Sequence, residues 1–110
     1  MSTIAHVSAL VNVDVAGAVV VMPNPLVITG GPVLILFQLV NTNYEFPDQQ
    51  AVVVTDPGPS FPRPSNTVAP RVATLYDTVQ AKGDFHYTVT VQHVATGQRL
   101  RVDPSIRNEH

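Results

Sequence analysis

Residues Phe85 to Val94 read FHYTVTVQHV, and their regular alternation of apolar and polar side chains is typical of a strand with one buried face. The apolar face comprises Phe85, Tyr87, Val89 and Val91, and the polar face comprises His86, Thr88, Thr90 and Gln92. Thr96-Gly97 follows as a two-residue hairpin turn, and residues 98–103 read as the returning strand. We therefore predict a β-hairpin near the C-terminus.

The same period of two recurs through the rest of the chain. Predicted strands cover residues 5–15, 18–22, 26–29, 33–40, 51–55, 71–79, 85–94 and 98–103. The segment 33–40 (VLILFQLV) is apolar at nearly every position, so we expect a central strand covered on both sides. Residues 56–70 contain five prolines and read as one long loop. A loop of this length either has a functional role or flexibility, or connects two sheets as a crossover.

Composition supports an all-β fold. Twenty of the 110 residues are valine, and β-branched side chains favour strands. Short strands, frequent turns and the absence of a helical pattern predict an immunoglobulin-like β-sandwich of about seven or eight antiparallel strands, in a single domain spanning residues 1–110. A small β-barrel is the competing architecture.

Charge and residue content exclude several classes of function. With net charge −2 and a single lysine, Lys82, the chain has no basic patch, so we expect no nucleic-acid partner. The absence of cysteine excludes thiolate chemistry, and the four histidines show no metal-ligand spacing, so we expect no metal and no cofactor. No run reaches the ~18 apolar residues of a membrane helix and the N-terminus lacks a basic start, so we predict a cytoplasmic protein without membrane contact.

The dipeptide Asp103-Pro104 is the strongest chemical candidate in the chain. The carboxylate of an Asp-Pro unit can reach its own backbone carbonyl through a five-membered ring, and the leaving nitrogen is a secondary amine. Proline also simply ends strands, because it has no N–H to donate to a ladder. A second Asp-Pro, Asp56-Pro57, lies in the proline-rich segment without ordered surroundings.

The predicted hairpin places Asp103 among polar side chains. Counting back from the two-residue turn sets Asp103 beside Thr90, on the face that also carries Thr88 and His86. We therefore expect Asp103-Pro104, and not Asp56-Pro57, to be the chemically special bond.

The C-terminal quarter resembles the small bacterial DP-EP family. The resemblance rests on Gly83–Val91 (GDFHYTVTV), on the Thr96-Gly97 turn and on the ending Asp103–Asn108 (DPSIRN). It implies a β-sandwich with self-cleaving, aspartic peptidase-like activity at an Asp-Pro bond near the C-terminus. The chain departs from the pattern in the family's name because it contains no Glu-Pro dipeptide.

The resemblance implies a mechanism in which water, or the Asp103 carboxyl itself, attacks the Asp103 carbonyl. A second carboxyl would activate the water, and Asp77 is our candidate because it sits in an otherwise apolar row. Its alternative role is to end a strand in solvent or to cap a turn. His86 would tune Asp103 or supply a proton, unless it is merely exposed. Lys82 is the one lysine that could form an isopeptide bond, but it lies far along the strand, so we expect hydrolysis.

Three functions remain open from the sequence. The first is a self-cleaving protein that hydrolyses its Asp103-Pro104 bond. The second is a non-catalytic structural or binding module whose strands or proline-rich loop could pair with another chain, including a second copy in a homodimer. The third is an adhesin-like surface domain, for which the sequence carries no export signal.

Overall fold

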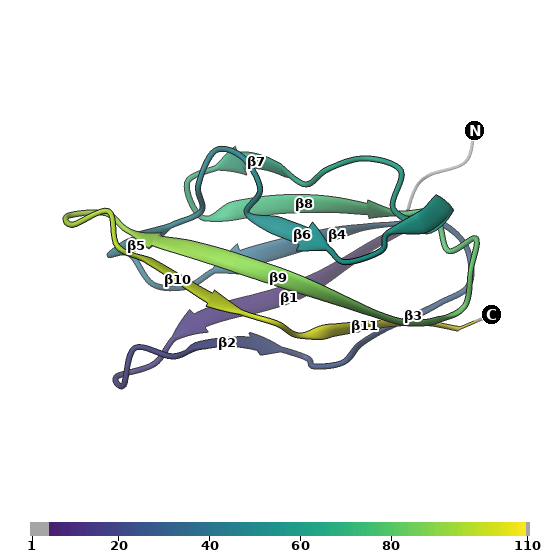
Figure 1. Cartoon of the computed structure of the whole chain (residues 1–110), viewed down its shortest axis with the longest axis horizontal. Coiled ribbons are helices and arrows are strands. Elements are labelled where there is room, and N and C mark those ends of the chain that lie inside the picture. Colours follow the sequence, from purple (N-terminus) through teal and green to yellow (C-terminus); the bar gives the residue numbers. More distant parts are fainter. Residues whose placement is uncertain (1–4, 110) are drawn as a thin grey trace.

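The computed structural model describes residues 5–109, which form eleven β-strands and one short 3₁₀ turn, so the predicted all-β class is confirmed (Figure 1). The strands are β1 (Ala5–Val13), β2 (Val19–Met22), β3 (Leu26–Thr29), β4 (Val33–Leu39), β5 (Tyr44–Glu45), β6 (Val52–Val54), β7 (Asn66–Ala69), β8 (Val72–Asp77), β9 (Gly83–His93), β10 (Arg99–Val102) and β11 (Ser105–Glu109). Among these residues, no helix is long and apolar enough to cross a membrane.

The strands form two sheets. One has five strands in the order β2-β1-β4-β8-β7. The other is built around β9, which pairs with β10 and β11 along one edge and with β5 and β6 along the other, while β3 lies beyond β11. The number of strands exceeds the seven or eight predicted because β5, β7 and β11 lie in segments for which the sequence predicts no strand.

Both sheets are mixed, which corrects the prediction of purely antiparallel strands. β1 pairs with β4 in parallel, and β3 pairs with β11 in parallel. The chain leaves the first sheet after β2, adds β3 to the second sheet and returns as β4 beside β1. β4 therefore runs parallel to β1, and the local periodicity of the sequence does not predict the relative direction of two strands.

The core lies between the two sheets and is made of the inward side chains of alternating strands. Phe37 of β4 and Tyr87 of β9 meet across it with ring centroids 5.6 Å apart. Three of the four residues predicted for the apolar face of β9, Tyr87, Val89 and Val91, are buried, while Phe85 is half-buried; Thr90 of the predicted polar face is also buried. Burial raises the pKa of the Tyr87 phenol, whose hydroxyl has no hydrogen-bond partner among residues 5–109.

Strand β4 differs from the prediction of a strand covered on both sides. Its odd positions, Val33 to Leu39, are buried between the sheets, but Leu34 and Leu36 are only half-buried and Gln38 is exposed. Within residues 5–109, only one face of this nearly all-apolar strand is therefore fully covered.

The proline-rich segment 56–70 is more ordered than one long loop. It contains the 3₁₀ turn Gly58–Ser60 and strand β7, which pairs with β8 and carries an irregularity in register between Thr67 and Ala69. Phe61 inserts into the core and meets the Phe85 ring edge-on at 5.1 Å. This segment leads the chain from the second sheet back to the first.

Candidate functional site

The Asp103-Pro104 dipeptide lies in the middle of a ladder, not at the end of the last strand. Arg99–Val102 pairs with Val89–Gln92 and Ser105–Asn108 with Gly83–His86, and both ranges share one register along β9. The Tyr87 amide donates to the Pro104 carbonyl oxygen at 3.1 Å, but proline has no N–H to return. β10 and β11 therefore pair with β9 like one continuous strand, in which only the hydrogen bond that Pro104 cannot donate is missing.

This register corrects the predicted hairpin by two residues. His93 pairs with Gln98 around a four-residue loop, since the His93 amide donates to the Gln98 carbonyl and the Gly97 amide to the His93 carbonyl, both at 2.8 Å. Asp103 consequently faces Thr88, and Thr90 faces Arg101. A shift of two residues keeps every side chain on its predicted face, which is why the alternation could not reveal the error.

On the outer face of the sheet, polar side chains of β9 contact polar side chains of β10, β11 and Asp103. Four cross-strand contacts are present: Arg99 Nε to Gln92 Oε1 at 3.0 Å, Thr88 Oγ1 to Asp103 Oδ1 at 2.7 Å, Ser105 Oγ to His86 Nδ1 at 3.4 Å, and Arg107 Nε to Asp84 Oδ1 at 2.9 Å. Such pairs form at the non-hydrogen-bonded positions of an antiparallel ladder, where opposite side chains approach most closely. They hold the chain in register on both sides of Asp103-Pro104.

The predicted cleavage residues are only partly brought together. Asp103 contacts Thr88, and His86 contacts the next residue, Ser105, but Thr90 lies opposite Arg101 and is buried. Lys82 is exposed at the start of β9, close to Asp84 and Arg107. The Asp103 side chain is exposed on the outer face, whereas the Pro104 ring is buried.

Asp77 lies inside the sandwich, on the opposite side of the sheet from Asp103. It is fully buried at the end of β8, and its Oδ1 accepts hydrogen bonds from the Val79 amide at 2.9 Å and from Asn108 Nδ2 at 3.1 Å. Its second oxygen, Oδ2, and Asn108 Oδ1 are both buried without a partner among residues 5–109. Burial raises the pKa of Asp77 more than these two hydrogen bonds lower it.

These contacts give Asp77 two structural roles. Through Asn108 it ties β8 of one sheet to β11 of the other. Through the Val79 amide it supports a valine at φ +55°, a left-handed backbone conformation that β-branched residues rarely adopt. The structure thus places Asp77 at a buried turn cap, which is one of its two predicted roles, and away from Asp103.

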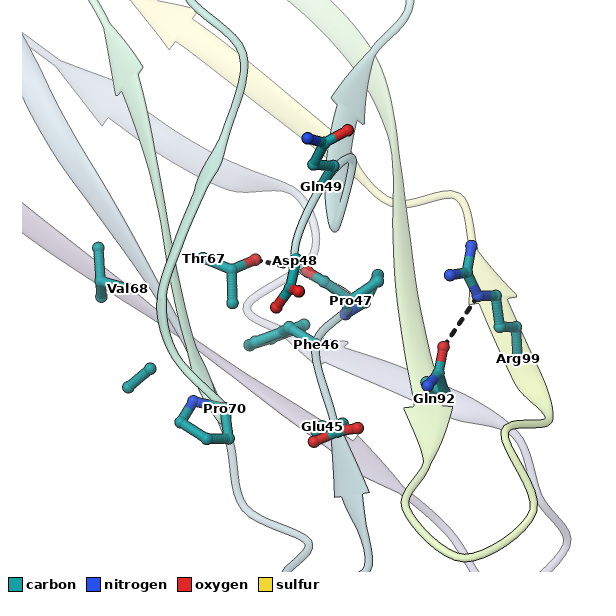
Figure 2. A pocket seen from close by; sticks show the side chains of 11 residues that line it. Glu45, Phe46, Pro47, Asp48, Gln49, Thr67, Val68, Pro70, Gln92 and Arg99 are labelled. Atoms are coloured by element: carbon teal, nitrogen blue, oxygen red, sulfur yellow. Dashed lines mark hydrogen bonds between the residues drawn. The ribbon is translucent and has the colours of Figure 1, made fainter.

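A groove lies on the side of the sandwich where β6 and β7 each have a strand neighbour on one side only. Its first part is a polar hollow of about 640 Å³, shown in Figure 2. The residues that line it are Glu45, Phe46, Pro47, Asp48, Gln49, Thr67, Val68, Ala69, Pro70, Gln92 and Arg99. Two carboxylates, Glu45 and Asp48, therefore share this hollow with the Arg99 guanidinium, whose Nε is bound to Gln92.

The second part of the groove is apolar and follows the first along the same two chain segments, 45–54 and 61–70. It has a volume of about 330 Å³, and its lining includes Val53, Pro57, Phe61, Pro62 and Leu75. The side chain of Val53 is 45% exposed. Together the two parts form an elongated surface between the edges of the two sheets.

Three hydrogen bonds join the two chain segments that line the groove. The Phe46 amide donates to the Pro70 carbonyl at 2.7 Å, the Thr67 hydroxyl to the Pro47 carbonyl at 2.6 Å (Figure 2), and the Val52 amide to the Ser65 hydroxyl at 3.1 Å. These bonds tie the segment 46–52, which belongs to one sheet, to the segment 65–70, which leads into the other.

Sequence reasoning did not identify the groove, although it singled out the proline-rich segment 56–70 that forms part of one wall. The residues of the other wall carry no motif, and they come together only because β5 and β6 both join β9. Within residues 5–109 no group of three or more His, Asp or Glu side chains is arranged to hold a metal ion.

Comparison with models of known protein families gives no match, and comparison with curated proteins gives no relative. The resemblance to the DP-EP family therefore stays a prediction, and function has to be argued from the geometry of the chain.

Proposed function

We propose that the protein is a non-catalytic β-sandwich module that binds an extended polypeptide in the groove between β6 and β7. The observation that carries this proposal is the groove whose two lining segments are joined by hydrogen bonds, bordered by two strands that each lack a neighbour on one side. An extended chain can gain backbone hydrogen bonds from such an edge and can place alternate side chains into adjoining pockets. The two sheets with inward-facing core residues also support an immunoglobulin-like arrangement, which we propose for the sandwich.

The lining of the groove defines the chemistry of the ligand. The apolar part, with Val53 and Phe61, fits aliphatic side chains, because burying such groups is favourable. The polar part offers the carboxylates of Glu45 and Asp48, which would accept a lysine, an arginine or an amino terminus. The proposed ligand is therefore an extended segment with apolar residues at one end and a cationic group at the other.

A lysine at the apolar part should abolish most of the binding. For peptides selected from a random library on the wild-type protein, we expect Val53→Lys to weaken affinity about tenfold or more, because an ammonium group would replace an apolar contact. Val27→Lys is the matched control, since Val27 is also 45% exposed and lies on β3, beyond β9 and β11 from the groove.

Amide chemical shifts measured by NMR during peptide titration locate the site. We expect changes in residues 45–54 and 61–70. Failure to select any peptide, equal effects of the two substitutions, or shifts confined to other strands would contradict the proposal.

We propose self-cleavage at Asp103-Pro104 as a second candidate, favoured by one observation. The Asp103 carboxyl is exposed beside a peptide bond held on both sides by cross-strand contacts, and the residue after Pro104, Ser105, contacts His86 through its hydroxyl. In the reaction one water is consumed and the C–N bond breaks. Asp103 gains a terminal carboxylic acid, and Pro104 becomes a free secondary amine. Because Asp77 contacts Asn108 inside the sandwich, this mechanism has to work without Asp77 as the base.

Intact mass under denaturing conditions, on fresh and aged protein, tests self-cleavage. If it occurs, fragments 1–103 and 104–110 should accumulate with time, disappear in Asp103→Ala and persist in Asp77→Asn. Asp56→Ala is the matched control, because Asp56-Pro57 is the other Asp-Pro bond and lies in an exposed segment. A single unchanged mass would contradict the proposal. Fragments cut at both Asp-Pro bonds would indicate ordinary acid lability instead.

A further inference from the structure

The outer face of the five-stranded sheet carries apolar side chains that no part of residues 5–109 covers. This outer face is formed by the even-numbered positions of β1, β2, β4 and β8, whose odd-numbered neighbours are largely buried in the core. Leu10, Val20 and Met22 on it are 49%, 39% and 64% exposed. Leu34, Leu36 and Tyr76 extend the same face and are half-buried.

The register places these side chains on neighbouring strands. Leu10 lies between Met22 of β2 and Gln38 of β4, while Leu34 lies beside Tyr76 of β8. A strand that is apolar on both faces, as β4 is, is typical of sheets covered on both sides. The apolar residues on both faces of β4 therefore indicate that a further surface packs against its outer face, and residues 5–109 do not provide one.

The outer face carries no Asp, Glu, Lys or Arg among the even-numbered positions of these four strands within residues 5–109. This matters for the identity of the packing partner, because in a two-fold dimer the same face meets its own copy, and an excess of one charge on that face would repel the copy. The face combines apolar side chains with the neutral polar side chains of Ser8, Asn12, Gln38 and Thr74 and with His6. A second copy would meet no carboxylate, ammonium or guanidinium group on it, and the face offers none of these groups to a charged partner. Two identical sheets also have the same twist, which lets them stack face to face with aligned strands.

From these features we infer that the outer face is the interface of a homodimer in which two copies stack through β1, β2, β4 and β8. This goes beyond the proposed peptide binding and uses a different surface from the groove. Four strands about 4.8 Å apart and about 23 Å long give a flat area of roughly 440 Å² for each copy. Two copies would therefore bury roughly 900 Å², which is below the roughly 1,200 Å² at which stable specific interfaces begin, so the dimer should be weak, with Kd in the micromolar range or above.

Sedimentation equilibrium from about 5 µM to 1 mM protein tests this inference. We expect the wild type to shift from monomer to dimer across this range. Leu10→Lys and Met22→Lys should raise the dimer Kd at least about tenfold, because each puts two like charges into the apolar contact. Both side chains are already exposed, so the variants should fold, which the cooperativity of their thermal unfolding checks.

Val53→Lys is the control, because Val53 is 45% exposed but lines the groove. Its dimerisation should match the wild type, so loss of peptide binding and loss of the dimer are distinguishable. A wild type that stays monomeric at 1 mM would overturn the inference. So would a dimer that resists both Leu10→Lys and Met22→Lys, or one that Val53→Lys disrupts equally.

Discussion

A chain that ends at Asp103 should fail to fold. Such a chain lacks β11, which lies inside its sheet between β9 and β3, so β3 loses its strand neighbour in that sheet. Pro104, Ile106 and Asn108 are buried, and Ile106 is completely inaccessible. Truncating a buried isoleucine to alanine alone costs about 2–5 kcal/mol. Loss of the whole strand should therefore exceed much of the roughly 5–15 kcal/mol that stabilises a small domain.

Circular dichroism and chemical denaturation test this expectation. We expect no cooperative transition for the chain 1–103 and a normal one for the chain 1–109, which lacks only His110. A synthetic peptide covering 104–109 should restore structure when added to 1–103, because the ladder and the cross-strand side-chain contacts do not need the Asp103-Pro104 bond. A cooperative transition in 1–103 alone would show that β11 is dispensable.

The same reasoning applies to self-cleavage. If the bond breaks in the folded protein, β11 should stay in place through its pairing with β9 and β3 and through Asn108. The cut protein would therefore keep the size of the intact one under native conditions. For this reason the mass measurement proposed above requires denaturing conditions.

Asp77→Ala should destabilise the fold by about 2–4 kcal/mol, whereas Asp77→Asn should leave it as stable or more stable at neutral pH. Alanine removes the acceptor for the Val79 amide and for Asn108 Nδ2, leaving buried donors without their partner. Asparagine keeps an acceptor oxygen and adds an NH₂ group that can donate to the unpartnered Asn108 Oδ1. It also removes a carboxylate from a buried site. Denaturant unfolding of the three proteins measures the difference, and equal losses in both variants would contradict this role.

The difference in stability between Asp77→Asn and the wild type should change with pH in one predictable direction. The pKa of Asp77 in the folded protein is raised above its ordinary value of 3.8, so the folded state holds this proton more tightly than the unfolded chain. The stability contributed by the proton is fully present below 3.8 and is lost as pH rises through the higher folded-state pKa. Relative to the wild type, Asp77→Asn should therefore gain stability as pH rises through this window.

Subtracting the stability of the wild type from that of Asp77→Asn leaves only the contribution of Asp77. The other carboxyls, such as Asp84 in its ion pair with Arg107, are the same in both proteins. A difference in stability between wild type and Asp77→Asn that stays constant from pH 3.5 to 7.5 would contradict the assignment.

The sequence by itself determined the all-β class, most of the strands and, for strands with clear alternation, the face that is buried. Alternation along Phe85 to Val94 was enough, because the side chains of a strand point to opposite faces with a period of two, which is a local property. The same reading placed Asp103 on the polar face. It also placed Asp77 in an apolar row, where the structure finds it fully buried.

Only the tertiary structure decided which strands pair. The parallel pairs β1–β4 and β3–β11, the position of β11 and the Asp77–Asn108 bond across 31 residues depend on contacts between distant segments. A shift of two residues in the last hairpin moved the partner of Asp103 from Thr90 to Thr88 without changing its face. Periodicity fixes faces but not neighbours, because the energy that selects a neighbour comes from packing and hydrogen bonds formed only when the chain folds.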